Sequence, residues 1–137
     1  MSRRLVVGIF SGVLVASCAV ASFAQDTKTI RGEVIDPALY LREGRHGVNE
    51  ADLINEAIDG GQSLALLEDG TNTIYLFLAG EPGEDPNDLV YEYVGQRVKV
   101  TGTPYERNGL KGVVATTVEP VEAATAPIPP PPSLKQP

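Results

Sequence analysis

Two alternating segments flank the dipeptide Asn108-Gly109, and this arrangement constrains the fold more than any other feature of the chain. The segment "QRVKVTG" (96–102) alternates polar and apolar residues, and "VVATTV" (113–118) follows the dipeptide. A period of two residues is typical of a half-buried strand. Asn-Gly between two such runs is the strongest short signal for a hairpin turn. The pattern therefore predicts a β-hairpin near the end of the chain.

The register of this hairpin is predicted to shift by one residue. A strict two-residue turn would place Val100 opposite Thr117 and misalign the apolar faces. A bulge would instead place Val100 opposite Val118. We expect the bulge near residues 102–104, because Pro104 cannot donate a hydrogen bond to the ladder.

Three more segments have the composition of short strands. Thr29–Asp36 alternates, whereas residues 63–68 and 74–78 are nearly continuous apolar runs joined by the turn residues 69–72. Glycines lie inside the first and fourth strands, where they would allow the sheet to bend, namely Gly32 and Gly102. The chain is therefore predicted to be mainly β, a small five-stranded OB-like barrel.

The stretch "VNEADLINEAIDGG" (48–61) predicts one inserted α-helix over about 49–59. Asn49 is a good N-cap with Asp52 three residues later, and two glycines follow the last turn. Val48 and Leu53 are spaced as a hydrophobic staple. We expect one apolar stripe of this helix to cover the barrel as a lid. The stripe consists of Leu53, Ile54, Ala57 and Ile58.

The two ends of the chain are predicted to lie outside the folded domain. Residues 1–24 have the basic start and apolar run of a signal peptide, which predicts a periplasmic or secreted protein. Cys18 ends a lipobox-like segment, so a membrane-anchored lipoprotein is the alternative. The domain is predicted to span 27–122. The alanine- and proline-rich residues 123–137 are predicted to form a disordered tail.

Charge and cysteine content exclude several classes of function. The formal net charge is −7, and removal of Arg3 and Arg4 with the signal peptide makes it more negative. Such a chain is repelled by phosphate backbones, so no nucleic-acid partner is expected. Cys18 is the only cysteine, which leaves none for a disulfide, a thiolate metal ligand or a thiol nucleophile after ordinary cleavage. We expect no cofactor and a monomeric domain, with membrane contact only if Cys18 is lipidated.

Aromatic and basic side chains on the predicted strands are the first candidates for ligand binding. OB-type barrels use aromatic platforms on one face, and Tyr75 and Phe77 share a strand face that could instead be core. The last hairpin holds a modest basic cluster, part of which cross-strand pairing with Glu106 would neutralise. The predicted ligand-binding residues are Tyr75, Phe77, Tyr105, Arg97 and Lys99.

The run "EPGEDPND" (81–88) offers oxygen ligands of the kind that calcium prefers. Its spacing does not fit an EF-hand. An alternative is that Asp85 caps a short helical turn that begins at Pro86. The weak calcium candidates are Glu81, Glu84, Asp85 and Asp88. His46, the sole histidine, lies in a polar loop, and no second histidine or Ser/His/Asp constellation accompanies it.

From Ile30 to Val121 the chain resembles a group of small exported bacterial proteins of uncharacterised function that share an OB-like barrel. The segments that support the resemblance are "GEVID" from Gly32, "ALYL" from Ala38, "AIDGGQ" from Ala57, "LLEDG" from Leu66 and "VGQRVKVTGT" from Val94. Many of those proteins have cysteines at the positions of Leu39, Leu53 and Ala57, and a histidine at that of Glu50. The resemblance therefore implies that Leu39 packs against Leu53 and Ala57, a hydrophobic tie in place of a metal or disulfide.

These observations favour a non-catalytic exported binding or accessory domain of the bacterial cell envelope, with an unknown protein or small-molecule partner. A calcium-dependent binding module that uses residues 81–88 is the first alternative. A weaker one is an enzyme acting on envelope polysaccharide, with Glu33 and Asp36 as acid and base. The sequence places no pair of carboxylates among apolar residues, which argues against general acid–base catalysis.

Overall fold

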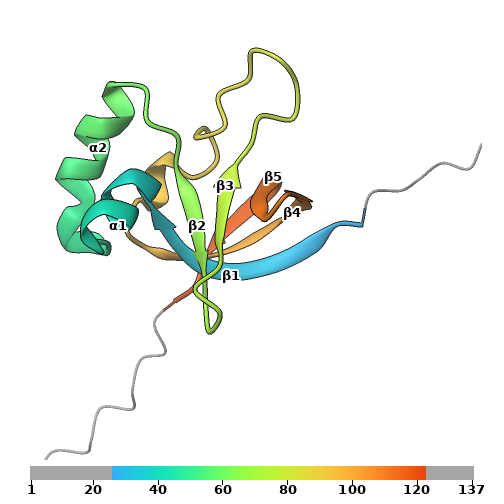
Figure 1. Ribbon diagram of the computed structural model, residues 1–137, viewed down its shortest axis with the longest axis horizontal. Helices are drawn as coiled ribbons and strands as arrows, with labels where there is room; N and C mark the ends of the chain where they lie inside the picture. The colour runs from blue at the N-terminus through green and yellow to red at the C-terminus, as the bar shows by residue number, and fades with distance from the viewer. Residues whose placement is uncertain (1–25, 123–137) are drawn as a thin grey trace, which may run out of the picture.

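The alternating segments form five strands that close into a barrel in the computed structural model, which describes residues 26–122 (Figure 1). The strands are β1 (Lys28–Ile35), β2 (Ala65–Glu68), β3 (Ile74–Phe77), β4 (Arg97–Arg107) and β5 (Leu110–Pro120). Their order around the barrel is β1-β2-β3-β5-β4, and only the β3–β5 pair is parallel. The predicted signal peptide at 1–24, its Cys18 and the tail at 123–137 lie outside the described residues.

The shifted register of the last hairpin is confirmed. Arg107 pairs with Leu110 around the Asn-Gly turn, whereas Val100 pairs with Val118, and the shift falls between Thr101 and Gly102. The extra residue is Thr116 of β5, between the partners of Thr101 and Gly102, so the bulge lies at one edge of the predicted stretch and not at Pro104, which pairs with Val113. The shift keeps Val118 on the same inner side of β5 as Val113 and Ala115, all three of which contact the core.

The glycines inside β1 and β4 are required by close backbone approaches. A Cβ atom on Gly32 would lie 2.3 Å from the carbonyl oxygen of Leu67, and one on Gly102 would lie 2.2 Å from that of Val114. No side chain fits at such distances. These two glycines therefore allow the strands to bend against their neighbours, as the sequence predicts.

The core fills the inside of the barrel and extends under the helices. Buried residues of one inner cluster come from all five strands and from both helices. Val34, Leu66 and Val100 are fully buried members from three strands, and Phe77 closes the cluster from a fourth. A smaller cluster of Ile35, Ala65 and Leu67 lies on the opposite, outer face of the same strands.

The insertion between β1 and β2 contains two short helices, so the prediction of a single helix over 49–59 is wrong. The helix α1 (Pro37–Glu43) precedes a 3-10 turn (Val48–Glu50) that leads into α2 (Ala51–Asp59). The carboxylate of Asp36 accepts a hydrogen bond from the backbone nitrogen of Ala38 at 2.8 Å. Asp as N-cap followed by Pro at the first helical position is a helix-start signal, although Asp36-Pro37 also fits the end of the alternating strand.

The details of α2 also differ from the prediction. The helix begins after the 3-10 turn, and no side-chain cap of Asn49 or Glu50 is found among the described residues. Its buried face is Ala51, Ile54 and Ile58, while Leu53 is 41% exposed. The predicted packing of Leu39 against Leu53 and Ala57 is therefore wrong: neither residue belongs to the buried cluster that contains Leu39, and the helix contributes Ile54 to that cluster instead. The predicted end of the helix at the two glycines is confirmed, because Gly61 has a φ of 94° and adopts the left-handed conformation.

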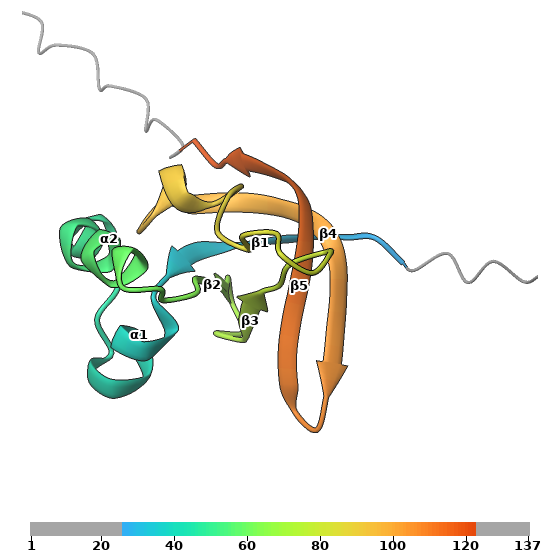
Figure 2. The ribbon, with the colours of Figure 1, turned by 90° about the horizontal axis from the view of Figure 1, so that it is seen from above.

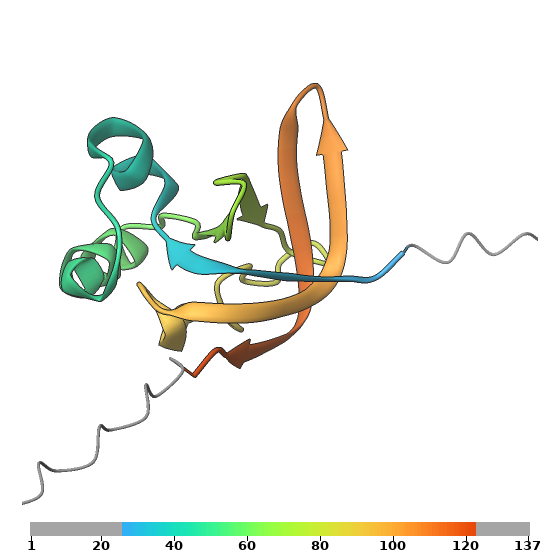
Figure 3. The same ribbon diagram turned by 90° about the horizontal axis from the view of Figure 1, so that it is seen from below.

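The β4–β5 hairpin projects beyond the other strands, on the side of the barrel away from the helices (Figures 2 and 3). The helices close one end of the barrel, and their inner face supplies Leu39 and Ile54 to the core. Within residues 26–122, none of the helices has the length and apolar character needed to cross a membrane.

Candidate functional site

An apolar row crosses the outer face of all five strands. Pairing follows the order Ile35 with Ala65, Ala65 with Leu76, Leu76 with Gly112, and Gly112 with Tyr105. Outer faces of small barrels are normally polar because they meet water. The α1 residue Tyr40 packs over the first part of the row, which is buried. The part on β3, β4 and β5 is open.

The open part of the row forms a pocket of about 300 Å³ between β3 and the projecting hairpin. We call it the hairpin pocket. Two of its leucines, Leu78 and Leu110, are 37% and 65% exposed, and Tyr105 is 40% exposed. The pocket is lined by Leu76, Leu78, Tyr105, Glu106, Arg107, Leu110, Lys111 and Gly112. Exposed apolar side chains gathered in one hollow, with polar groups at its edge, are typical of a binding site.

The register of β3 and β5 creates this hollow. The two strands pair at Leu76–Gly112 and Phe77–Val113, and the hairpin then diverges from β3. Gly112 leaves room at the floor of the pocket, where a Cβ atom would lie 2.6 Å from the side chain of Leu78. The pocket therefore depends on a strand glycine that keeps the side chain of Leu78 close to the sheet.

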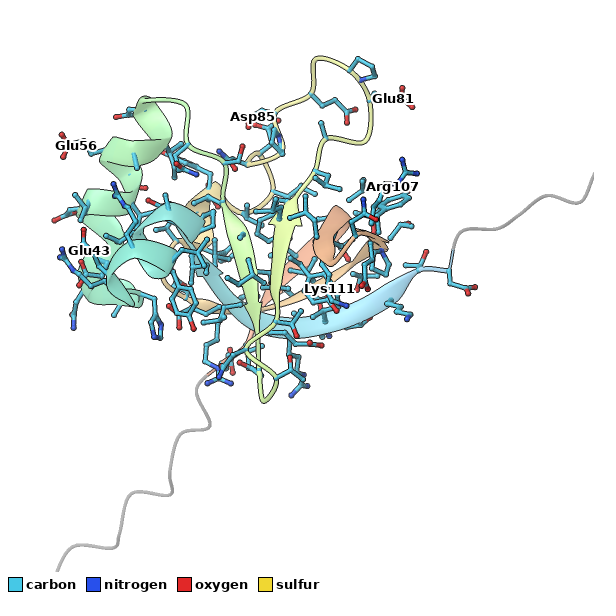
Figure 4. The ribbon with its side chains drawn as sticks, viewed as in Figure 1. Glu43, Glu56, Glu81, Asp85, Arg107 and Lys111 are labelled. Atoms are coloured by element: carbon cyan, nitrogen blue, oxygen red, sulfur yellow. The ribbon has the colours of Figure 1, made fainter. Side chains whose placement is uncertain are left out.

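The rim of the hairpin pocket is cationic, although the protein as a whole is acidic. Lys111 pairs with Glu106 across the hairpin at 2.7 Å, and this hydrogen bond raises the pKa of the lysine. The side chain of Arg107 forms no hydrogen bond or ion pair with another residue of the described range 26–122. Figure 4 places Arg107 and Lys111 on the hairpin, on the other side of the molecule from Glu43 and Glu56 of the helices.

A second hollow of about 370 Å³ opens at the end of the barrel, on the inner side of the same hairpin. It shares Tyr105, Glu106 and Lys111 with the hairpin pocket and reaches Tyr75, above whose ring Lys111 Nζ lies at 6.0 Å. The split between β3 and the hairpin thus opens toward both faces of the sheet.

The structure brings only some of the predicted ligand-binding residues together. Tyr75 and Tyr105 line the second hollow, but Phe77 is 3% exposed and belongs to the core, as the alternative in the sequence analysis had it. Arg97 and Lys99 lie at the other end of β4, where they pair with Asp69 and Glu119. They are therefore separate from the cations of the hairpin, and both are already neutralised by an acid.

The acidic loop uses two of its four carboxylates to hold its own backbone. Glu84 Oε2 accepts hydrogen bonds from the backbone nitrogens of Gly80 and Glu81, at 3.1 and 3.0 Å. Asp85 Oδ1 accepts one from Asn87 at 2.9 Å, which confirms the predicted cap. Among residues 26–122, no group of three or more His, Cys, Asp or Glu side chains is arranged to hold a metal ion.

The carboxylates considered for acid–base chemistry have structural partners. Asp36 is buried and caps α1, as described above. A carboxylate oxygen of Glu33 lies 3.0 Å from Nδ1 of His46, and the rings of His46 and Tyr40 form a T-shaped contact with their centroids 5.5 Å apart. His46 is thus not simply solvated: it fastens the loop between α1 and α2 to β1.

The leucines of the hairpin pocket were not among the residues predicted to bind a ligand. Leu76 and Leu78 were visible in the continuous apolar run 74–78, which has apolar residues on both faces of a strand. A strand of a small barrel needs only one apolar face, so the second face was the available signal. The role of Gly112 depends on the β3–β5 register, which local patterns do not give.

Comparison of the chain with protein-family models, with curated proteins and with solved structures found no match. The function is therefore inferred from the geometry described above.

Proposed function

We propose that this chain is a non-catalytic, exported binding domain of the bacterial cell envelope, built on an OB-like barrel, and that it binds its ligand at the hairpin pocket. The observation that carries the proposal is the open end of the outer apolar row. Leu76, Leu78 and Leu110 meet there around Gly112, with Tyr105 beside them. Exposed apolar surface of this kind costs solubility unless it is used.

The position of the pocket supports the OB-like assignment. In OB barrels the ligand face lies on strands 2 and 3, bounded by the loop between strands 4 and 5. Here β3 and the β4–β5 hairpin line the pocket. The net charge of −7 argues against nucleic acid as the ligand.

Export is inferred from residues 1–24, and the intact mass of the protein recovered from its native envelope tests it. A mature start at Gln25 supports periplasmic or secreted protein, and a lipidated Cys18 supports the membrane-anchored alternative.

Binding at the hairpin pocket is tested by nuclear magnetic resonance on the isotope-labelled full chain. Four probe classes are titrated: leucine-containing peptides, oligosaccharides, lysophospholipid and single-stranded oligonucleotides. The proposal expects at least one class to shift the amide signals of Leu76, Leu78 and Gly112. The variant Leu110→Ser should weaken the effect, and Leu41→Ser, which alters a 73% exposed leucine on α1, should not. If no class shifts those amides at millimolar concentration, the pocket is not the binding site.

A further inference from the structure

The hairpin pocket combines an apolar floor with a cation that no described residue neutralises. Arg107 lines the pocket beside Leu110, and its side chain makes no hydrogen bond or ion pair within residues 26–122. Lys111 is paired with Glu106, so the pair contributes little net charge to the rim. The guanidinium of Arg107 is therefore available to a ligand, and its planar set of donors matches a carboxylate.

The distribution of charge over the molecule makes Arg107 selective for an anionic group. The remaining surface is rich in acids: α1 and α2 alone contain Glu43, Asp52, Glu56 and Asp59, which are exposed. The acidic loop 81–88 adds four carboxylates on the other side of Leu78. An anionic group is therefore repelled by these acidic surfaces, and within the hairpin pocket it is attracted by Arg107. An uncharged apolar ligand would gain nothing from Arg107.

We propose that the occupant of the hairpin pocket is an extended segment of a partner protein that inserts an apolar side chain between Leu78 and Leu110 and places a carboxylate beside Arg107. This inference rests on the proposed function and names its ligand class. The pocket of about 300 Å³ is open along the divergence of β3 and β5, which suits a linear segment. The aliphatic and aromatic walls accept a leucine-like side chain. The adjacent Arg107 favours a segment in which an acidic residue lies next to that side chain.

The shape of the site favours a protein segment over the other envelope ligands. Oligosaccharides are held by stacking on exposed aromatic rings and by polar side chains, whereas the open walls of this pocket are mainly leucine. A lipid surface would be attracted by several cations on one face and repelled by a chain of net charge −7. A peptide offers both a leucine-sized side chain and a carboxylate within one or two residues.

The experiment uses fluorescently labelled octapeptides and the full chain. The first peptide has two leucines flanking an aspartate, the second has lysine in place of the aspartate, and the third has serines in place of the leucines. Binding is followed by fluorescence anisotropy at low salt. We expect the first peptide to bind about tenfold more tightly than the second, the difference expected of one charge-assisted hydrogen bond. The third should bind more weakly than the first, and added salt should reduce the preference for aspartate.

Matched variants separate the two contributions. Arg107→Gln should abolish the preference for aspartate, whereas Arg31→Gln should preserve it, since Arg31 is an exposed arginine of β1 outside the pocket. Leu110→Ser should weaken both leucine peptides, and Leu41→Ser should weaken neither. All four side chains are exposed, so the variants are expected to fold, which thermal unfolding verifies.

The outcomes distinguish this inference from the proposed function. If an oligosaccharide or lysophospholipid shifts the amides of the pocket while no peptide binds, the peptide inference is overturned and the binding site stands. If peptides bind but Arg107→Gln leaves the preference for aspartate unchanged, the assignment of Arg107 is overturned. If no probe of any class binds at the pocket, both proposals fall.

Discussion

Val100 lies directly opposite Val118, one residue out of the register that the Asn108-Gly109 turn would impose alone. The β-bulge that produces this shift lies beside Gly102, which approaches the carbonyl of Val114 too closely for any side chain. The bulge and the glycine allow both strands of the hairpin to bend, and both strands take part in the closed barrel.

Replacement of Gly102 by alanine is expected to destabilise the barrel. A Cβ atom there would lie 2.2 Å from a backbone oxygen, so β4 and β5 would have to separate at the bulge. We expect the free energy of unfolding to fall by about 2–3 kcal/mol, as in other overpacked sites. Urea denaturation measures it. The control is Gly60→Ala, where the nearest atom is 3.4 Å away, and an equal loss in both variants would refute the close-approach argument.

Asp36 is expected to contribute more to the free energy of unfolding than Asp52, the carboxylate that the sequence predicts in a capping box. Its side chain accepts the hydrogen bond of Ala38 at the start of α1, so Asp36→Ala should cost about 1–2 kcal/mol. Asp36→Asn retains a capping oxygen and should cost less. Asp52→Ala should change the unfolding free energy by less than about 0.5 kcal/mol. Thermal and urea unfolding of the three variants give the comparison, and a larger effect at Asp52 would contradict it.

Asn87 is expected to anchor the loop after β3 to the start of β2. Its buried side chain accepts from the backbone nitrogen of Leu64 at 2.9 Å and donates to the carbonyl oxygen of Gln62 at 3.0 Å. Asn87→Ala leaves a buried donor unpaired, which should cost about 3 kcal/mol. The exposed residue Asn55 serves as control, since Asn55→Ala should stay within about 0.5 kcal/mol. Similar unfolding free energies for the two variants would rule out the anchor.

The ion pair between Lys111 and Glu106 should stabilise the hairpin only while the lysine is protonated. The hydrogen bond to Glu106 raises the pKa of Lys111 in the folded protein. Its contribution is therefore fully present below the ordinary lysine pKa of about 10.4 and is lost as the pH rises through the raised value. A titration of the side-chain carbon signals of Lys111 should show this pKa falling toward its ordinary value in Glu106→Gln. An unchanged pKa would show that the pair does not form.

Calcium binding by the acidic loop stays a prediction, which substitution of two carboxylates of the loop can test. Glu84 and Asp85 hold the loop backbone, whereas Glu81 and Asp88 have no side-chain hydrogen bond or ion pair within residues 26–122. Because half of the carboxylates already have backbone partners, we expect millimolar calcium to leave the melting temperature unchanged. A rise of several degrees that the double variant Glu81→Gln/Asp88→Asn abolishes would establish the calcium-binding alternative.

The extent of prediction differed among the elements for physical reasons. The strands, the Asn108-Gly109 turn and the bulge follow from residue period and from pairing of apolar faces, which are local or nearest-neighbour properties. The helix α1 was missed although its signal was local: Asp36-Pro37 ends a strand as well as it begins a helix, and only the hydrogen bond to Ala38 distinguishes the two. In α2 the 3-10 turn shifts the buried face from Leu53 to Ile54.

The sequence by itself determined a small five-stranded domain, the glycines that let it close and an acidic net charge. Only the tertiary structure decided which side chains meet. Arg97 and Lys99 share a strand with Tyr105 but lie away from it and pair with acids, whereas Leu76, Leu110 and Arg107 converge from three strands on one pocket. The reason is that the pocket depends on the parallel pairing of β3 with β5, a contact between distant parts of the chain that no local pattern encodes.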